Sequence, residues 1–364
     1  MGSRLDELSS HGVSVWLDSL SREMLDTGQL SRLVEADSVV GVTSNPTIFE
    51  KALSTGDWYD EQLRAELEQS DDTKEVFFAL AVEDVRRACD LLWPTWKRTD
   101  GVDGFVSIEV DPDLAFDREA SFAQAKELAE LVDRANVYVK IPGTAPGLGA
   151  IEDSIAAGRP INVTLIFSLA RYAEVVAAYI GGLERLVASG GDPTNVVSVA
   201  SFFVSRVDTE ADRRLAEVGR HDLQGKLAIA NAKLAYQHYL QAFSGERWEE
   251  LAAAGARPQR CLWASTSTKN PSYRDVLYVE ELVGRDTVNT MPLETIEAFQ
   301  DHGITRDTLT EDVDAARSLV DEIAVAGVDY DDVTATLEAE GVQKFSDSFA
   351  SLLAGIDAKR AALV

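Results

Sequence analysis

The sequence has little cysteine and no long apolar run, and both shortages narrow the class of protein. Two cysteines, Cys89 and Cys261, in 364 residues are too few for a disulfide framework and are typical of a reducing compartment. No stretch reaches the roughly 18 consecutive apolar residues of a membrane span. The first residues, MGSRLDELSSHG, lack the apolar core of a secretory signal. We therefore expect a cytoplasmic protein.

Basic residues are scarce: 34 Lys and Arg stand against 62 Asp and Glu, and the formal net charge is −28. Such a surface repels nucleic acid and anionic membranes, which are bound through clustered cations. It also repels phosphorylated metabolites at long range, so any phosphate site has to be a local pocket. We expect no nucleic acid and no membrane partner. The few basic residues at strand ends are therefore the candidates for a phosphate pocket.

Motifs for metal and nucleotide binding are missing as well. The four histidines have no ligand spacing, and no G-x-G-x-x-G opens a helix after the first expected strand. Residues 219–227 have the wrong spacing for a phosphate-binding P-loop. We therefore expect no metal and no cofactor. The histidines are His11, His221, His238 and His302.

The sequence does contain a regular alternation of short β-rich runs and longer amphipathic stretches. The runs are apolar and rich in Val, Ile or Phe, as strands buried on both faces are. Eight strands alternating with helices predict a parallel sheet closed into a (β/α)8 TIM barrel. The alternative, an open doubly wound sheet, is disfavoured by the missing glycine motif. The expected strands are Val13–Asp18, Val39–Ser44, Gly104–Glu109, Val137–Lys140, Pro160–Leu165, Val196–Ser201, Arg260–Ala264 and Thr287–Asn289. Helical periodicity is clearest over Lys74–Trp93, Arg118–Arg134, Ser168–Ala188, Thr209–Val218 and Lys226–Phe243.

The last part of the chain, residues 304–364, predicts more helix than one barrel unit needs. Its periodic stretches are Thr310–Ala326, Tyr330–Glu340 and Val342–Ala362, which we take as extra C-terminal helices packed on the barrel. No low-complexity linker precedes them. We therefore expect one domain, residues 1–364, with 304–364 as a helical extension.

Polar residues end the expected strands, and the active sites of (β/α)8 barrels lie at that rim. Lys140 ends a strand between Val139 and Ile141. For an isolated lysine, a side chain that reaches into solvent would be the favoured interpretation. A lysine that is partly desolvated in the barrel mouth instead has a lowered pKa and can attack a carbonyl as the neutral amine. Asp18 and Glu109 could divide acid and base roles. The simpler interpretation of Asp18 is an N-cap for a helix beginning near Ser21.

Further strand-end residues suggest a binding pocket around this lysine. Asn162 and Thr164 are two apart and therefore share one face of a strand. Asn45 stands before Pro46, where a simple turn is the alternative. Arg206 and Lys269, with Ser201 and Ser267, could bind phosphate, and ordinary surface ion pairing is the alternative for the two cations.

At this point six segments in register resemble the transaldolase family, in the class I Schiff-base aldolase superfamily. They extend from about Asp18 to His302, and the long helical tail is similar to a longer bacterial branch. The segments are GVTSNPTIFEKAL at 41–53, VSIEVDP at 106–112, VYVKIPGT at 137–144, INVTLIFS at 161–168, VASFFVSRVD at 199–208 and WASTSTKNPSY at 263–273.

The resemblance implies an enzyme of the non-oxidative pentose phosphate pathway. It would move a dihydroxyacetone unit from sedoheptulose 7-phosphate to glyceraldehyde 3-phosphate, giving erythrose 4-phosphate and fructose 6-phosphate. Lys140 would form the Schiff base, Asp18 would take the C4 hydroxyl proton, and Glu109 with Thr164 would position a shuttling water. The other implied contacts are Asn45 and Asn162 to sugar hydroxyls and the enamine, Ser201 and Phe203 in the pocket, and Arg206, Ser267 and Lys269 to phosphate.

The sequence departs from the family at Lys269, where many members have arginine and its bidentate fork. Two other interpretations compete. A fructose-6-phosphate aldolase of the same superfamily would release free dihydroxyacetone, but resemblance to that branch would imply Gln and Tyr in place of Glu109 and Phe203. A noncatalytic barrel would have no use for Lys140, Asp18 and Glu109 together. A monomer and a homodimer are both compatible with the sequence.

Overall fold

A computed structural model describes residues 2–363, with side chains up to 361. Its eight strands form one closed parallel barrel in sequence order, in which β1 also pairs with β8. The predicted (β/α)8 fold is therefore confirmed. The strands are β1 Val13–Leu17, β2 Val39–Val42, β3 Val106–Glu109, β4 Val137–Pro142, β5 Ile161–Ile166, β6 Ser198–Phe203, β7 Arg260–Ala264 and β8 Thr287–Met291.

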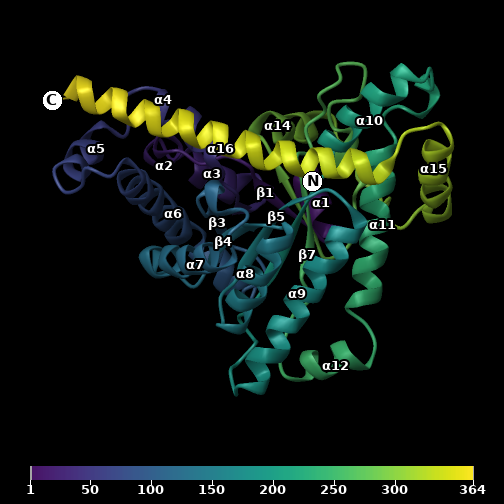
Figure 1. The fold of residues 1–364 in the computed structure, drawn as a ribbon, viewed down its shortest axis with the longest axis horizontal. Helices are drawn as coiled ribbons and strands as arrows, with labels where there is room; N and C mark the ends of the chain where they lie inside the picture. The colour runs from purple at the N-terminus through teal and green to yellow at the C-terminus, as the bar shows by residue number, and fades with distance from the viewer. Residues whose placement is uncertain (1, 364) are drawn as a thin grey trace.

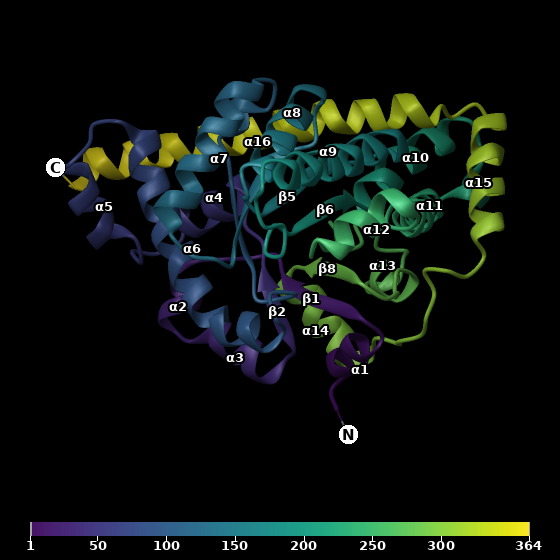
Figure 2. The same ribbon diagram turned by 90° about the horizontal axis from the view of Figure 1, so that it is seen from below.

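Helices follow each strand and surround the barrel (Figures 1 and 2). Several short helices that the periodicity did not predict, among them α2 to α5, fill the connections after β1 and β2. The elements outside the barrel wall are α1 Arg4–Ser10, α2 Arg22–Asp26, α3 Gln29–Ala36, α4 Pro46–Ser54, α5 Asp60–Leu67, α6 Thr73–Arg98, η1 Pro112–Leu114, α7 Arg118–Val132, α8 Ala145–Ala156, α9 Leu169–Ala188, α10 Ser205–Glu217, η2 His221–Leu223, α11 Leu227–Ala242, α12 Glu246–Ala253, α13 Leu277–Glu281, α14 Leu293–His302, α15 Val313–Val325 and α16 Tyr330–Leu363.

The C-terminal region differs from the prediction in one respect. Two helices were expected on either side of Gly341, whereas the structure has one helix, α16, that continues through it. A glycine inside a helix costs only about 1 kcal/mol relative to alanine, and α16 offsets this by burying Phe345, Phe349, Leu352 and Ile356. Figure 1 shows α16 extending from α15 across the barrel to α4 and α5.

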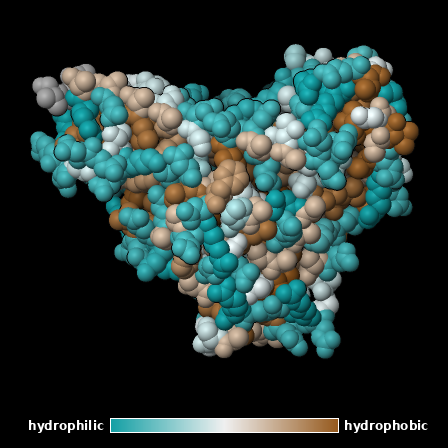
Figure 3. Space-filling view, viewed as in Figure 1, coloured by the Kyte–Doolittle hydropathy of each residue, from teal (hydrophilic) through white to brown (hydrophobic). Residues whose placement is uncertain are grey.

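The strands are buried on both faces, as parallel strands covered by helices should be. Every residue of β4, β5 and β6 is buried. The outer surface seen in Figure 3 is mainly hydrophilic, with smaller hydrophobic groups between. Among residues 2–363, no helix is both long and apolar enough to cross a membrane.

Candidate active site

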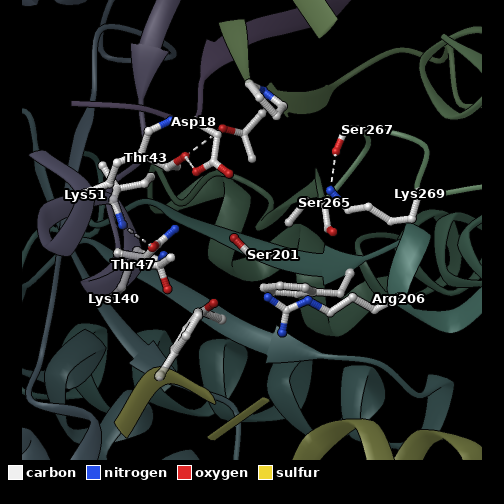
Figure 4. A pocket seen from close by; sticks show the side chains of 18 residues that line it. Asp18, Thr43, Thr47, Lys51, Lys140, Ser201, Arg206, Ser265, Ser267 and Lys269 are labelled. Atoms are coloured by element: carbon white, nitrogen blue, oxygen red, sulfur yellow. Dashed lines mark hydrogen bonds between the residues drawn. The ribbon is translucent and has the colours of Figure 1, made fainter. Parts of the chain in front are cut away.

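A pocket of about 290 Å³ opens at the carboxyl ends of the strands. Figure 4 shows two sides of it: Asp18, Thr43, Thr47, Lys51 and Lys140 on one, and Arg206, Ser265, Ser267 and Lys269 on the other, with Ser201 between them. The lining residues are Asp18, Thr43, Asn45, Thr47, Ile48, Lys51, Lys140, Thr164, Ser201, Phe203, Arg206, Ala264, Ser265, Ser267, Lys269, Thr290, Pro292 and Phe345. Nine of the eleven residues expected in the site thus line one cavity.

The other two, Glu109 and Asn162, lie directly beside that cavity, and the strand register brings them there. Glu109 pairs with Lys140 across β3 and β4, and Lys140 pairs with Asn162 across β4 and β5. Three neighbouring strands therefore present a carboxylate, an amine and an amide at one level of the barrel. A slip of one residue in any of these strands would point the side chain away from the others.

Lys140 is a buried amine with a close carboxylate. Its side chain is only 6% exposed, Nζ lies 3.0 Å from Glu109 Oε2, and Nζ also donates a 2.9 Å hydrogen bond to the carbonyl of Ser44. Burial raises the pKa of Glu109, and the nearby Lys140 cation opposes that rise. Glu109 Oε1 has no hydrogen-bond partner among the described residues. The solvent-facing alternative for Lys140 is therefore wrong.

Asp18 follows β1 and lies on the same side of the pocket as Lys140 (Figure 4). Thr43 Oγ1 donates a 2.7 Å hydrogen bond to Asp18 Oδ1. Burial raises the pKa of Asp18, while Lys140, Thr43, Arg206 and Lys269 each lower it. The N-cap of α2 is Ser21, which accepts from Met24 N, so the alternative role of Asp18 as helix cap is wrong.

Asn162 and Thr164 have different surroundings although they share a strand face. Asn162 donates through Nδ2 to Ser107 Oγ at 3.1 Å and accepts from Ser201 Oγ at 2.7 Å. Its amide is thus held in one orientation. Thr164 Oγ1 is buried and has no hydrogen-bond partner within the described part of the chain. Because buried hydroxyls are normally paired, this hydroxyl is free to bond to a molecule in the pocket.

Two cations, Arg206 and Lys269, lie on the far side of the pocket (Figure 4). Lys269 Nζ donates to Ser267 Oγ at 2.7 Å, and the Arg206 guanidinium lies 5.1 Å from the centre of the Phe203 ring. Burial lowers the pKa of Arg206, and its Nη1 has no hydrogen-bond partner among residues 2–363. Within those residues neither cation has a carboxylate within 4.0 Å, so surface ion pairing does not explain them.

Asn45 caps a helix and also faces the pocket. It is the N-cap of α4, where Oδ1 accepts from Ile48 N at 3.0 Å and Pro46 occupies the first turn, and it also lines the pocket. Sequence reasoning missed Lys51 and Phe345. Both lie on helices, where the strand-end rule does not search. No three His, Cys, Asp or Glu side chains of the described chain are grouped as metal ligands.

A closed (β/α)8 barrel with a buried lysine and carboxylates in its mouth defines an enzyme barrel equipped for carbonyl chemistry. Comparison with known proteins identifies the family. The sequence model of the family "Transaldolase/Fructose-6-phosphate aldolase" matches residues 15–356, and this chain belongs to that family. Similar proteins include a transaldolase of Acidothermus cellulolyticus, 52% identical over 98% of this chain and 96% of its own length. A transaldolase of Thermobifida fusca is 52% identical over 97% of each chain, and one of Mycobacterium bovis is 50% identical over 96% and 95%.

Proposed function

We propose that this protein is a transaldolase that acts through a Schiff base on Lys140. Its reaction would transfer a dihydroxyacetone unit from sedoheptulose 7-phosphate to glyceraldehyde 3-phosphate, releasing erythrose 4-phosphate and forming fructose 6-phosphate. The observation that carries the proposal is the buried Lys140–Glu109 pair, 3.0 Å apart, whose lysine lines a pocket that has cations at its other side.

The first step needs Lys140 as the neutral amine. Its ammonium proton has an acceptor in Glu109, and the raised pKa of Glu109 favours the protonated acid. The amine then attacks C2 of the ketose, and loss of the C2 oxygen as water gives a protonated imine. We assign the proton transfers of this step to Glu109, with Thr164 Oγ1 holding the water. General acid–base help of this kind contributes about 10²–10⁴-fold.

Carbon–carbon cleavage then follows from the imine acting as an electron sink. Asp18 takes the proton of the C4 hydroxyl, the C3–C4 bond breaks, and its electron pair enters the imine to give an enamine on Lys140. The aldehyde fragment leaves, and the enamine attacks the carbonyl carbon of the acceptor aldehyde. Asp18 returns the proton to the new hydroxyl, and water releases the product from Lys140. A raised pKa makes Asp18 a stronger base once it is ionised.

The remaining lining residues fit a phosphorylated sugar. Asn45, Asn162 and Ser201 lie near the lysine and would hold the hydroxyls of the three-carbon unit. Arg206, Ser267 and Lys269 would bind the phosphate, because amines and guanidinium groups without a carboxylate partner favour an anion. The Phe203 ring lies 5.1 Å from the Arg206 guanidinium and packs against it. Glu109 and Phe203 also favour transaldolase over the aldolase activity of the same family, in which the resemblance implies Gln and Tyr.

The proposal also covers the compartment and the oligomeric state of the enzyme. Cys89 and Cys261 are free and buried, which is compatible with the reducing cytoplasm. A monomer and a homodimer are both compatible with this proposal. The reaction as written uses the side chains of the protein alone for acid–base and nucleophilic chemistry.

The proposal is tested by borohydride reduction in the presence of fructose 6-phosphate, followed by peptide mass spectrometry. We expect a reduced three-carbon adduct on Lys140 rather than on Lys51 or Lys269, and no adduct in Lys140→Ala. Asp18→Asn is the matched control, because it should still form the imine but trap the uncleaved six-carbon sugar. A folded wild-type protein that gives no adduct would rule out the Schiff-base mechanism.

A further inference from the structure

Strand β5 contains a bulge directly after Thr164. Val163 pairs with Ala200 and Ile166 with Phe202, so Thr164 and Leu165 together stand opposite the single residue Ser201. Leu165 has φ +59°, a left-handed conformation that a bulky apolar residue rarely adopts. The other non-glycine residues with positive φ in the described chain are all Ser or Asp outside strands. The backbone that aims Thr164 is therefore strained.

A strained conformation persists only where its surroundings hold it, and here helix α16 does so. The helix passes over the end of β5 at Gly341. A Cβ atom at this position would stand 3.0 Å from Leu165 Cδ2 and 3.4 Å from Phe167 Cε2. Leu165 is 1% exposed, so its side chain has little room to move aside. The bare backbone of Gly341 thus lets the helix lie directly on the bulge.

The same face of α16 continues along the pocket. Phe345, one turn after Gly341, lines the cavity. Ser348 Oγ is 2.9 Å from Oγ1 of Thr47, another lining residue, and the Phe349 ring lies 5.3 Å from that of Phe77 in an edge-on contact. Spacings of three and four residues place all four side-chain positions on one helical face. The helix is therefore fixed to both the β5 and the α4 sides of the site.

The beginning of α16 is fixed to β5 as well. Tyr330 Oη accepts a 3.0 Å hydrogen bond from Leu169 N and donates a 2.6 Å bond to Asn231 Oδ1. Asn231 in turn donates to the carbonyl of Phe167 at 2.8 Å. The chain that leaves β5 is thus bonded to α16 before the helix reaches the bulge, which limits how far the helix can lift away from Leu165.

We propose that Gly341 is a positioning residue for the reaction: by seating α16 on Leu165 it fixes the bulge and so the direction of the Thr164 hydroxyl. This inference rests on the proposed function, in which Thr164 and Glu109 serve the water step of imine formation. A side chain at residue 341 would press on Leu165 at 3.0 Å and so misplace Thr164. It would meet Phe167 less closely, at 3.4 Å, and the Phe167 ring lies 5.1 Å from that of Phe203 on the way to Arg206.

The test compares Gly341→Ala with Gly355→Ala, a glycine of the same helix whose Cβ would meet nothing within 4 Å. Both changes improve helix propensity, so the melting temperature of Gly355→Ala should equal or exceed that of wild type, and its activity should match. For Gly341→Ala we expect imine formation, measured by single-turnover borohydride trapping, to slow about tenfold. The KM for the sugar phosphate should stay within about twofold, since the added methyl group meets Leu165 more closely than Phe167, the neighbour of Phe203 and Arg206.

A double-mutant cycle with Leu165→Ala keeps the test decisive if Gly341→Ala folds poorly. Leu165→Ala alone should slow imine formation because the bulge loses its support, and adding Gly341→Ala to it should cost nothing further because the obstructing Cδ2 is gone. Equal imine rates in wild type, Gly341→Ala and Leu165→Ala would overturn the inference. No adduct in wild type itself would instead contradict the proposed function.

Discussion

At the scale of the residue, burial of Asp208 links stability to pH. Asp208 lies in the first turn of α10 and is 1% exposed. It accepts hydrogen bonds from Ala228 N at 2.8 Å and from Tyr278 Oη at 2.9 Å. Burial is the main cause that raises its pKa to about 7, and the nearby Asp212 raises it further, while the hydrogen bonds lower it. The folded protein therefore keeps a proton that the unfolded chain releases near pH 4.

The sign of the resulting pH dependence follows from proton binding. Between about pH 4 and pH 7 the folded state binds one more proton at Asp208 than the unfolded state, so stability falls as pH rises through this window. We expect Asp208→Asn to remove that fall. Between pH 5 and pH 8 the loss of unfolding free energy should be smaller in the variant by on the order of 2–3 kcal/mol, measured by urea denaturation at both pH values.

Asp222→Asn is the control for this measurement. Asp222 is exposed, and its hydrogen bond to Arg220 lowers its pKa to about 2. The contribution of Asp222 to stability is therefore lost only as pH falls below about 4. The difference in unfolding free energy between pH 5 and pH 8 should be the same in Asp222→Asn as in wild type. If Asp208→Asn behaved like Asp222→Asn, Asp208 would be ionised in the folded protein throughout this range.

At the scale of the element, the loop after β7 determines where Lys269 lies. Ser267 and Lys269 belong to it, and Tyr273 Oη fixes its far end by a 2.6 Å hydrogen bond to Asp212 Oδ2 of α10. Asp212 Oδ1 also accepts from Gly225 N at 2.8 Å. The helix that begins with Ser205 and Arg206 is thus tied to the loop that contains Lys269.

We expect Tyr273→Phe to loosen this loop. Loss of a hydrogen bond is worth about 1 kcal/mol, which corresponds to a KM for phosphorylated sugars raised about fivefold, with kcat nearly unchanged. Tyr236→Phe is the matched control, because Tyr236 Oη donates to the Arg285 carbonyl, which precedes β8 at the opposite end of the barrel. A steady-state comparison of the two variants checks this, and equal KM values would contradict an anchoring role.

Strands and their rim residues were predictable because two local rules apply to them. Buried parallel strands are short continuous apolar runs, and β7 was placed at its observed bounds. The rule that active sites lie at strand ends then predicted Lys140, Glu109 and Asp18, which the structure brings close together. It could not find Lys51 or Phe345, which enter the pocket from helices through tertiary packing. Gly341 was taken for a helix break because the close approach of Leu165 is invisible in the local sequence.

At the scale of the whole molecule, the C-terminal helices join the barrel over a wide surface. Helix α16 contacts α4, α5, α6, α10, η1 and β5, and α15 packs on α11. Phe349 illustrates the packing: it is 2% exposed, its ring meets those of Phe77 and Phe78, and the Lys74 ammonium lies 5.5 Å from its centre. We propose that residues 1–364 form one domain, with 304–364 unable to unfold separately.

Scanning calorimetry tests this proposal. One cooperative domain gives a single transition whose calorimetric and van't Hoff enthalpies agree. Phe349→Ala should cost about 3–5 kcal/mol, the usual loss for a buried phenylalanine, and should move the whole transition to lower temperature. Val325→Ala, at a side chain 87% exposed, should leave it in place. If Phe349→Ala moved only part of the trace, the helical extension would be a separate folding unit, and the seat of α16 on β5 would open independently of the barrel.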